Sequence, residues 1–97
     1  MRYGIVLAPQ ALEDLRSLSA RERAAVRDAL ATHLRHQPGR VSKSRTKRLR
    51  GVNQPQFRLR IDETRVFYDV RGGAVEILAI IRKSEAAQWL ERHGKRR

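Results

Sequence analysis

The chain has 97 residues, of which 40% are hydrophobic, and 22 lysines and arginines stand against ten acidic residues. This length suits one domain, residues 1–97, and the apolar content allows a packed core and excludes a disordered chain. Without cysteine the protein has no disulfide, no thiolate nucleophile and no thiolate zinc ligand. No apolar run approaches the roughly 20 residues that cross a membrane, and Pro9 comes too early for a secretory signal, so we expect a cytoplasmic protein.

The formal net charge of +12 attracts polyanions. A solvated surface loop is one interpretation of the most basic segment, 40–50, which contains no acid. An anionic membrane suits this segment less well, because Val41 and Leu49 are its only large apolar residues and form no lipid-facing stripe. We therefore expect a nucleic acid as the partner, and no membrane association. The basic residues of the segment are Arg40, Lys43, Arg45, Lys47, Arg48 and Arg50.

The first half of the chain predicts a strand and two helices. Apolar residues alternate over 3–7, as in a short strand, and Pro9 suits the first turn of a helix. Ser19 and Glu22 have the spacing of a capping box, so a second helix begins there and ends before Gln37-Pro38-Gly39. The short connection between the helices predicts an αα-hairpin. The expected core positions are Tyr3, Ile5, Leu7, Leu12, Leu15, Leu18, Val26, Leu30 and Leu34.

The second half predicts a meander of strands and a last helix. After the basic segment, which we expect to be a loop or a frayed turn, strands are predicted over 56–61, 64–70 and 75–81. Ser84 is expected to cap the last helix, and the tail Lys95-Arg96-Arg97 is expected to be loose. The order β-α-α-β-β-β-α predicts an α+β fold, with a small antiparallel-rich sheet and the αα-hairpin packed on one face.

Alternation within the predicted strands brings arginines together. If the apolar residues of 57–61 face the helices, Arg58 and Arg60 face the other way, and Arg65 of the next strand joins them. Like charges crowded in this way favour a bound anion, and we expect the phosphates of a nucleic acid there. The alternative is that acids neutralise the arginines, and the candidates are Asp62, Glu63 and Asp69.

Cleavage of RNA requires activation of the 2′-hydroxyl, stabilisation of a charge-rich transition state and a proton for the leaving oxygen. His33 and His36 are expected on the second helix, away from the arginines, and His93 near the end of the last helix. No cluster of carboxylates predicts a metal site, so neither a metal nor another cofactor is expected. Any acid–base chemistry therefore falls to arginine and lysine.

Several segments in a fixed order bring a known family to mind. They are Ala8…Ala11-Leu12-Glu13-Asp14-Leu15, Lys47-Arg48-Leu49-Arg50-Gly51, Phe57-Arg58-Leu59-Arg60 and Arg65-Val66-Phe67-Tyr68-Asp69-Val70. With the element order, they resemble the RelE/ParE superfamily of bacterial type II toxins over nearly the whole chain, and its RelE-like branch more closely. This resemblance implies a ribosome-dependent mRNA interferase, a metal-independent endoribonuclease that cuts the codon in the ribosomal A site. It also implies a cognate antitoxin as partner, which we expect to be acidic and partly disordered.

The resemblance further implies roles for single residues. Arg58 and Arg60 match two basic positions, the first being the proton acceptor, and Arg65 matches the arginine that stabilises the transition state. Arg82 or Lys83 would support the leaving group. Trp89 takes the position of a stacking tyrosine, although it could equally pack the last helix onto the sheet. The predicted catalytic residues are Arg58, Arg60, Arg65, Lys83 and Trp89, and the predicted RNA-binding residues are Lys43, Arg45, Lys47, Arg48, Arg50 and Arg82.

Two other functions remain open from the sequence. The ParE branch of the superfamily poisons DNA gyrase without nuclease chemistry, and the departures at Arg58, Lys83 and Trp89 are compatible with it. A plain RNA-binding module is less well supported, because only Phe67 is placed to stack on a base where such modules use two or three aromatic residues.

Overall fold

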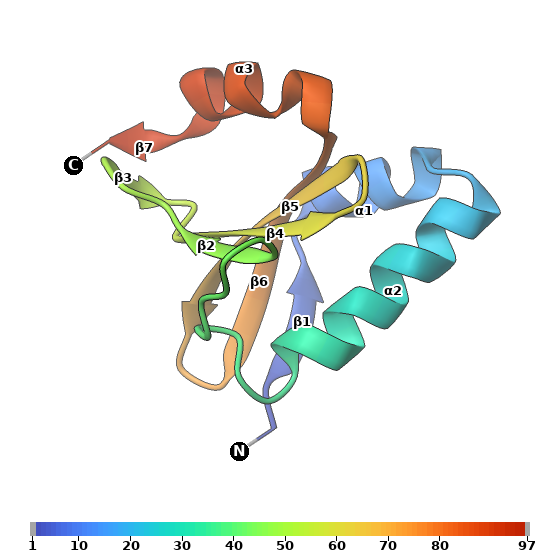
Figure 1. Cartoon of the computed structure of the whole chain (residues 1–97), viewed down its shortest axis with the longest axis horizontal. Coiled ribbons are helices and arrows are strands. Elements are labelled where there is room, and N and C mark those ends of the chain that lie inside the picture. The colour runs from blue at the N-terminus through green and yellow to red at the C-terminus, as the bar shows by residue number, and fades with distance from the viewer. Residues whose placement is uncertain (1, 97) are drawn as a thin grey trace.

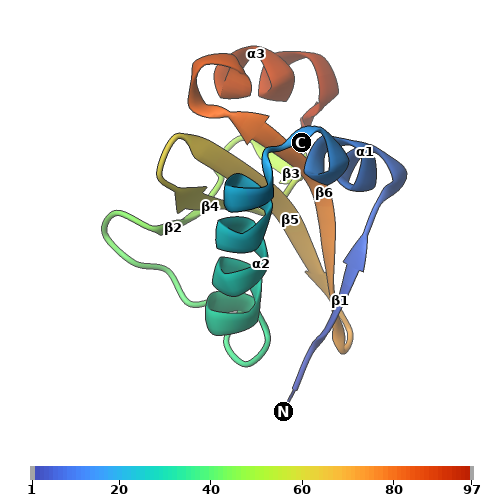
Figure 2. The ribbon, with the colours of Figure 1, turned by 90° about the vertical axis from the view of Figure 1, so that its right-hand side faces the viewer.

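A computed structural model describes residues 2–96, with a mixed five-stranded sheet between two layers of helix (Figures 1 and 2). Helices α1 and α2 cover one face of the sheet, and α3 crosses the other face. The predicted α+β class and αα-hairpin are confirmed, and three short strands are added to the predicted order. The elements are β1 (Gly4–Leu7), α1 (Pro9–Ser17), α2 (Ala20–Leu34), β2 (Thr46–Arg48), β3 (Val52–Gln54), β4 (Phe57–Ile61), β5 (Thr64–Arg71), β6 (Ala74–Arg82), α3 (Lys83–His93) and β7 (Lys95–Arg96).

The sheet has the strand order β1-β6-β5-β4-β2. Strand β1 pairs with β6 in parallel, and every other neighbouring pair is antiparallel. The two longest strands, β5 and β6, lie at the centre, and the αα-hairpin packs with α1 on β6 and α2 on β4. None of the helices in residues 2–96 combines the length and apolar character needed to traverse a bilayer.

The start of α2 confirms the predicted capping box. The Glu22 amide donates to Ser19 Oγ at 3.1 Å, and the Ser19 amide donates to Glu22 Oε1 at 3.0 Å. These two bonds satisfy amides that the first helical turn leaves without partners, and they lower the pKa of the Glu22 carboxyl. The tight corner before Ser19 places α2 beside α1.

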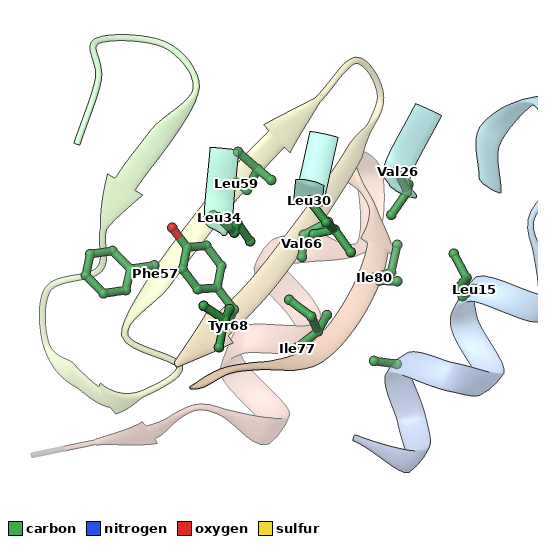
Figure 3. Close-up of a cluster of buried hydrophobic side chains, with 12 residues drawn as sticks. Leu15, Val26, Leu30, Leu34, Phe57, Leu59, Val66, Tyr68, Ile77 and Ile80 are labelled. Carbon is green, nitrogen blue, oxygen red and sulfur yellow. The ribbon is translucent and has the colours of Figure 1, made fainter. Parts of the chain in front are cut away.

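The core lies between the helices and the inner face of the sheet (Figure 3). Val26, Leu30 and Leu34 are buried as predicted, but Leu12 of α1 is 38% exposed, contrary to prediction. The helix instead turns Ala11 and Leu15 inward, one turn apart on one face. The helix residues pack against buried residues on the inner face of the sheet, which are Phe57, Leu59, Val66, Tyr68, Val75, Ile77 and Ile80.

Tyr68 is the largest buried side chain of this core, and its polar end has a partner. The hydroxyl donates to the Pro38 carbonyl at 2.6 Å, and the ring stacks on Phe57 at 5.2 Å between centroids. Burial raises the pKa of the Tyr68 phenol well above its usual value. This contact ties the segment after α2 to the middle of the sheet.

The basic segment contains a short strand, which was not predicted from the sequence. Residues 46–48 form β2, which pairs with β4 so that Lys47 lies opposite Arg58 and Arg48 opposite Phe57. Thr46 is buried at this edge. The strand forms through backbone pairing with β4, because its three residues are all polar and show no alternation of apolar and polar side chains.

The C-terminal tail is ordered, contrary to prediction. Lys95 and Arg96 form β7, which pairs with β3 in a separate two-stranded sheet; residue 97 lies outside the described residues. Gly94 precedes this strand, and a Cβ there would lie 2.5 Å from the Leu90 carbonyl oxygen, so only glycine fits. The pairing fastens the far end of α3 to the segment between β2 and β4.

A bulge in β6 is held by α1. Phe67 pairs with Ala79 and Tyr68 with Ile77, which leaves Leu78 as an extra residue. Beyond it, the Ile80 amide donates to Asp14 Oδ2 at 2.9 Å, and burial raises the pKa of this carboxyl.

We predict that Asp14→Ala lowers the free energy of unfolding by about 1–3 kcal/mol at pH 7, because the Ile80 amide loses its acceptor. Asp14→Asn keeps an acceptor without a buried charge and should leave stability within about 0.5 kcal/mol of the parent. Urea denaturation at pH 7 and pH 4 measures both.

The pH dependence has a defined sign. Since the pKa of Asp14 is raised on folding, its stabilising contribution is complete below the unfolded pKa and is lost as pH rises through the folded one. The parent should therefore gain stability relative to Asp14→Asn as pH falls. An asparagine variant as unstable as the alanine variant would contradict the prediction.

Candidate nucleic-acid interface

The outer face of the sheet, opposite α1 and α2, carries the three predicted arginines. Arg60 of β4 lies directly opposite Arg65 of β5, and Arg58 lies opposite Phe67 on the same face. Directly opposed residues of neighbouring strands project from one side of a sheet. The structure therefore brings Arg58, Arg60 and Arg65 together, and we call this surface the arginine face.

Arg58 is the most constrained of the three. Its side chain is partly buried, and its Nε has no hydrogen-bond partner among the described residues. Burial lowers the pKa of the Arg58 guanidinium, and the charges of Arg65 and Arg60 lower it further. A desolvated cation beside two like charges has a strong tendency to bind an anion.

Arg65 is not open on this face. It is 6% exposed, and its Nη1 donates to the carbonyl oxygens of Asp62 at 2.8 Å and Thr64 at 3.1 Å. These bonds hold the turn between β4 and β5, where Asp62 has a φ of 51°. Arg65 thus stabilises the local backbone and contributes its positive charge from a buried position, whereas the Arg60 side chain is exposed.

The acids do not neutralise the arginines. Asp69 is fully buried, and accepts hydrogen bonds from the Gln56 amide and Gln54 Nε2, both at 2.7 Å. Its charged partner is Arg71 at 3.4 Å. Within residues 2–96, Asp62, Glu63 and Asp69 form no ion pair with the arginine face.

Helix α3 covers part of this face. Trp89 stacks on Phe67 with 4.9 Å between ring centroids and 12° between planes. Its Nε1 also donates to Gln10 Oε1 of α1 at 3.3 Å, and its other neighbour is the His93 ring at 5.2 Å. Phe67 is completely buried, so the expectation that it is free to stack on a base is wrong. Of the two interpretations of Trp89, the structure shows the packing one.

The junction between β6 and α3 lies beside Arg65. Arg82 pairs with Thr64, and the Lys83 amide donates to the Glu63 carbonyl at 2.8 Å. The Arg82 and Lys83 side chains are exposed. A cavity of about 300 Å³ opens next to them between α1, β6 and α3, but none of the three arginines lines it.

The basic segment divides between two sides of the sheet. Lys47 lies beside Arg58 on the arginine face, whereas Arg48 lies over the Phe57 ring at 4.9 Å and so belongs to the other side. Arg48 and Arg50 line an open groove of about 710 Å³ together with Lys47. Lys43 is exposed in the loop before β2.

Arg45 lies apart from the arginine face, in a cavity of about 330 Å³ that His33 and His36 also line. Burial and the Arg45 charge lower the pKa of His33. The two histidines of α2 are thus away from the arginine face, as predicted. The predicted RNA-binding residues are thus spread over more than one side of the sheet, because strand β2 turns the neighbouring side chains of Lys47 and Arg48 to opposite sides.

Two residues that contact Trp89 at this site were not predicted from the sequence. Gln10 is an exposed polar residue on α1, and only the packing of α3 shows that it binds Trp89. His93 was expected near a frayed end, but the β7 pairing keeps it beside Trp89.

We predict that Arg58→Met raises the free energy of unfolding by about 1 kcal/mol, since it removes a buried unpaired donor and relieves like-charge repulsion while keeping the aliphatic stem. The gain should shrink as salt screens that repulsion. Urea denaturation at low and high salt measures it. Arg60→Met, on the exposed position of the same strand, is the control and should change stability by less than about 0.5 kcal/mol. A loss of stability in Arg58→Met would show that the arginine has a partner.

Comparison with protein families gives one match. The model described as ParE toxin of type II toxin-antitoxin system, parDE, matches residues 5–87. A search of curated proteins finds no match.

Comparison with solved structures finds the same fold in toxin structures of the RelE type. A chain of the RelBE2 toxin-antitoxin complex from Mycobacterium tuberculosis is 28% identical, with a TM-score of 0.66 over 84% of this chain and 99% of that one. The free RelE toxin of E. coli, in a mutant form, is 23% identical, with a TM-score of 0.68 over 94% of this chain and 93% of that one. The archaeal RelE-RelB complex from Pyrococcus horikoshii is 24% identical, with a TM-score of 0.64 over 86% and 97%.

Proposed function

The chain belongs to the ParE toxin family within the RelE/ParE superfamily of type II toxins, and we propose that it stops translation by cleaving messenger RNA on the arginine face. The observation that carries the proposal is the crowding of Arg58, Arg60 and Arg65, which have no carboxylate partner among residues 2–96. RNA phosphates supply the missing negative charge. The reaction would take place in the cytoplasm, on messenger RNA held by the ribosome.

The chemistry follows from the different surroundings of the three arginines. Attack of the 2′-hydroxyl on the adjacent phosphorus gathers negative charge on the phosphate oxygens, and preorganised cations stabilise that charge. Arg60, exposed near the β4–β5 end of the face, is placed to contact the phosphate, and Arg65 adds charge from its fixed position beside the turn. The lowered pKa of Arg58 is the direction that suits a proton acceptor.

The leaving 5′-oxygen needs a proton or a cation. Lys83 and Arg82 lie at the end of β6 beside the turn that Arg65 holds, so either is within the neighbourhood of a phosphate on that side. Lys83 is the better proton donor of the two, because an ammonium group gives up a proton more readily than a delocalised guanidinium. Lys47, next to Arg58, extends the phosphate-binding surface toward β2.

A cognate antitoxin is the second partner in this proposal. Two of the similar structures are toxin-antitoxin complexes of the RelBE type. An acidic, partly disordered antitoxin would complement the net charge of +12 and would gain buried apolar area on binding.

Inhibition of DNA gyrase is the alternative function. The family match favours it, because it is to the ParE toxins. A toxin acting in this way binds its target without nuclease chemistry, so it needs no free arginine face, and Trp89 would keep its structural role.

Two assays on the purified chain separate these functions. We expect the protein to stop synthesis in a translation extract and to cut the translated messenger, as detected by primer extension. It should leave gyrase-driven supercoiling of a plasmid unchanged. Inhibition of supercoiling with uncut messenger would establish the alternative instead.

A charge-matched pair of variants tests the site. Arg60→Ala should lower the rate of messenger cleavage about 10²- to 10³-fold, the loss typical of one preorganised donor. Because Arg60 is exposed, its loss should leave folding intact. Arg27→Ala removes the same charge from the exposed side of α2 and should cleave normally. Equal cleavage by both variants would exclude Arg60 from the site.

A further inference from the structure

Phe67 occupies the centre of the arginine face. In the sheet register it stands in a row with Lys47, Arg58 and Ala79, so one flank of the ring is cationic and the other is a small methyl group. The ring is completely buried, and its stacking partner is the indole of Trp89. An aromatic ring beside unpaired cations is a combination that single-stranded nucleic acids bind.

The helix that covers Phe67 is held by few contacts. None of the residues of α3 is buried, whereas α2 buries three. Besides the ring stack, the attachments are the 2.8 Å bond from the Lys83 amide to the Glu63 carbonyl at the start of the helix, one hydrogen bond of 3.3 Å from Trp89 to Gln10, and the short pairing of β7 with β3. Contacts of this kind, with little buried apolar area, are typical of elements that open locally.

The Trp89 indole resembles a nucleic-acid base in shape and in its ability to stack and to donate a hydrogen bond. Its indole is a flat bicyclic ring of about the size of a purine, it carries an N–H donor, and it lies nearly parallel to Phe67. The backbone of a stacked nucleotide would place a phosphate near Arg58, whose Nε lacks a partner, and near exposed Arg60. The tryptophan fills the ring position, but no carboxylate within the described part of the chain pairs with these cations.

We propose that Phe67 is a base-binding platform and that single-stranded RNA binds by displacing Trp89, stacking one base on Phe67 with its phosphate on Arg58 and Arg60. The inference rests on the proposed function, whose RNA-binding face it makes specific. It assigns to Phe67 the recognition of a base, with purines favoured by their larger stacking area, and to Trp89 the role of an internal occupant of the same place.

The chain carries its own probe for this exchange, because Trp89 is its one tryptophan. We would titrate the full chain with a short 2′-O-methyl oligoadenylate, which lacks the attacking hydroxyl and stays intact. Emission of Trp89 should shift to longer wavelength, and its quenching by acrylamide should rise as the indole enters solvent. A backbone-matched oligomer without bases and inorganic polyphosphate are the charge controls.

The expected result is that the oligoadenylate binds about 5- to 150-fold more tightly than the abasic oligomer, the effect of one stacked base. The fluorescence change should accompany the oligoadenylate alone. A spectrum unchanged at saturation, no binding, or an equal change with polyphosphate would each overturn the proposal. A change produced only by an acidic peptide would assign the face to a protein instead.

Two variants of the platform complete the test. Phe67→Tyr keeps a stacking ring and should keep the preference for bases, whereas Phe67→Leu should bind both oligomers equally and with the same salt dependence. Thermal melting identifies variants that fail to fold, and the tyrosine variant keeps the test decisive if the leucine variant does not fold. Loss of the base preference in Phe67→Tyr, or its retention in folded Phe67→Leu, would overturn the proposal.

Failure of the proposed function would look different. If bases release Trp89 but the messenger is not cleaved in the translation extract, the proposed nuclease function is wrong and the base-binding role of Phe67 stands. If folded Phe67→Leu cleaves normally and Trp89 does not move, the base-binding role of Phe67 is wrong and the proposed nuclease function stands.

Discussion

The pairing of β4 with β5 determines what each side of this protein can do. In five consecutive positions the two strands meet without a bulge, so every apolar residue that faces α2 sends a neighbour to the opposite side. Burial of Phe57, Leu59 and Val66 therefore forces Arg58, Arg60 and Arg65 onto one surface. The hydrophobic effect that stabilises the core thus concentrates positive charge on the outer face.

The sequence predicted those elements whose periodicity is strong, and it failed where tertiary contacts decide. The capping box, the stripe of α2 and the alternation of β4 and β5 are local patterns, and each appears in the structure. Strands β2, β3 and β7 have two or three residues each, without apolar alternation, and exist because a partner strand supplies hydrogen bonds. Leu12 shows a smaller failure, since spacing alone did not settle which of two helix phases faces the sheet.

Prediction of the site was limited in the same way. Alternation placed the three arginines on one face, but it could not show that Arg65 turns back to the carbonyls of its own turn. Nor could it show that Trp89 would lie on Phe67, because that contact joins α3 to the middle strand of the sheet. Charge density identified 40–50 as a basic segment, but it could not show that the pleat of β2 directs Lys47 and Arg48 to opposite sides. Which residues share a face follows from sequence; which side chains close over one another does not.

The position of α3 in the chain has a consequence during synthesis. Every strand of the five-stranded sheet precedes Lys83, so the sheet and the αα-hairpin leave the ribosome before α3 and β7 do. Domains begin to fold from the N-terminal side as they emerge. The residues that form the cationic surface are therefore made before those that cover it, so α3 can pack onto the sheet only as a late step of folding.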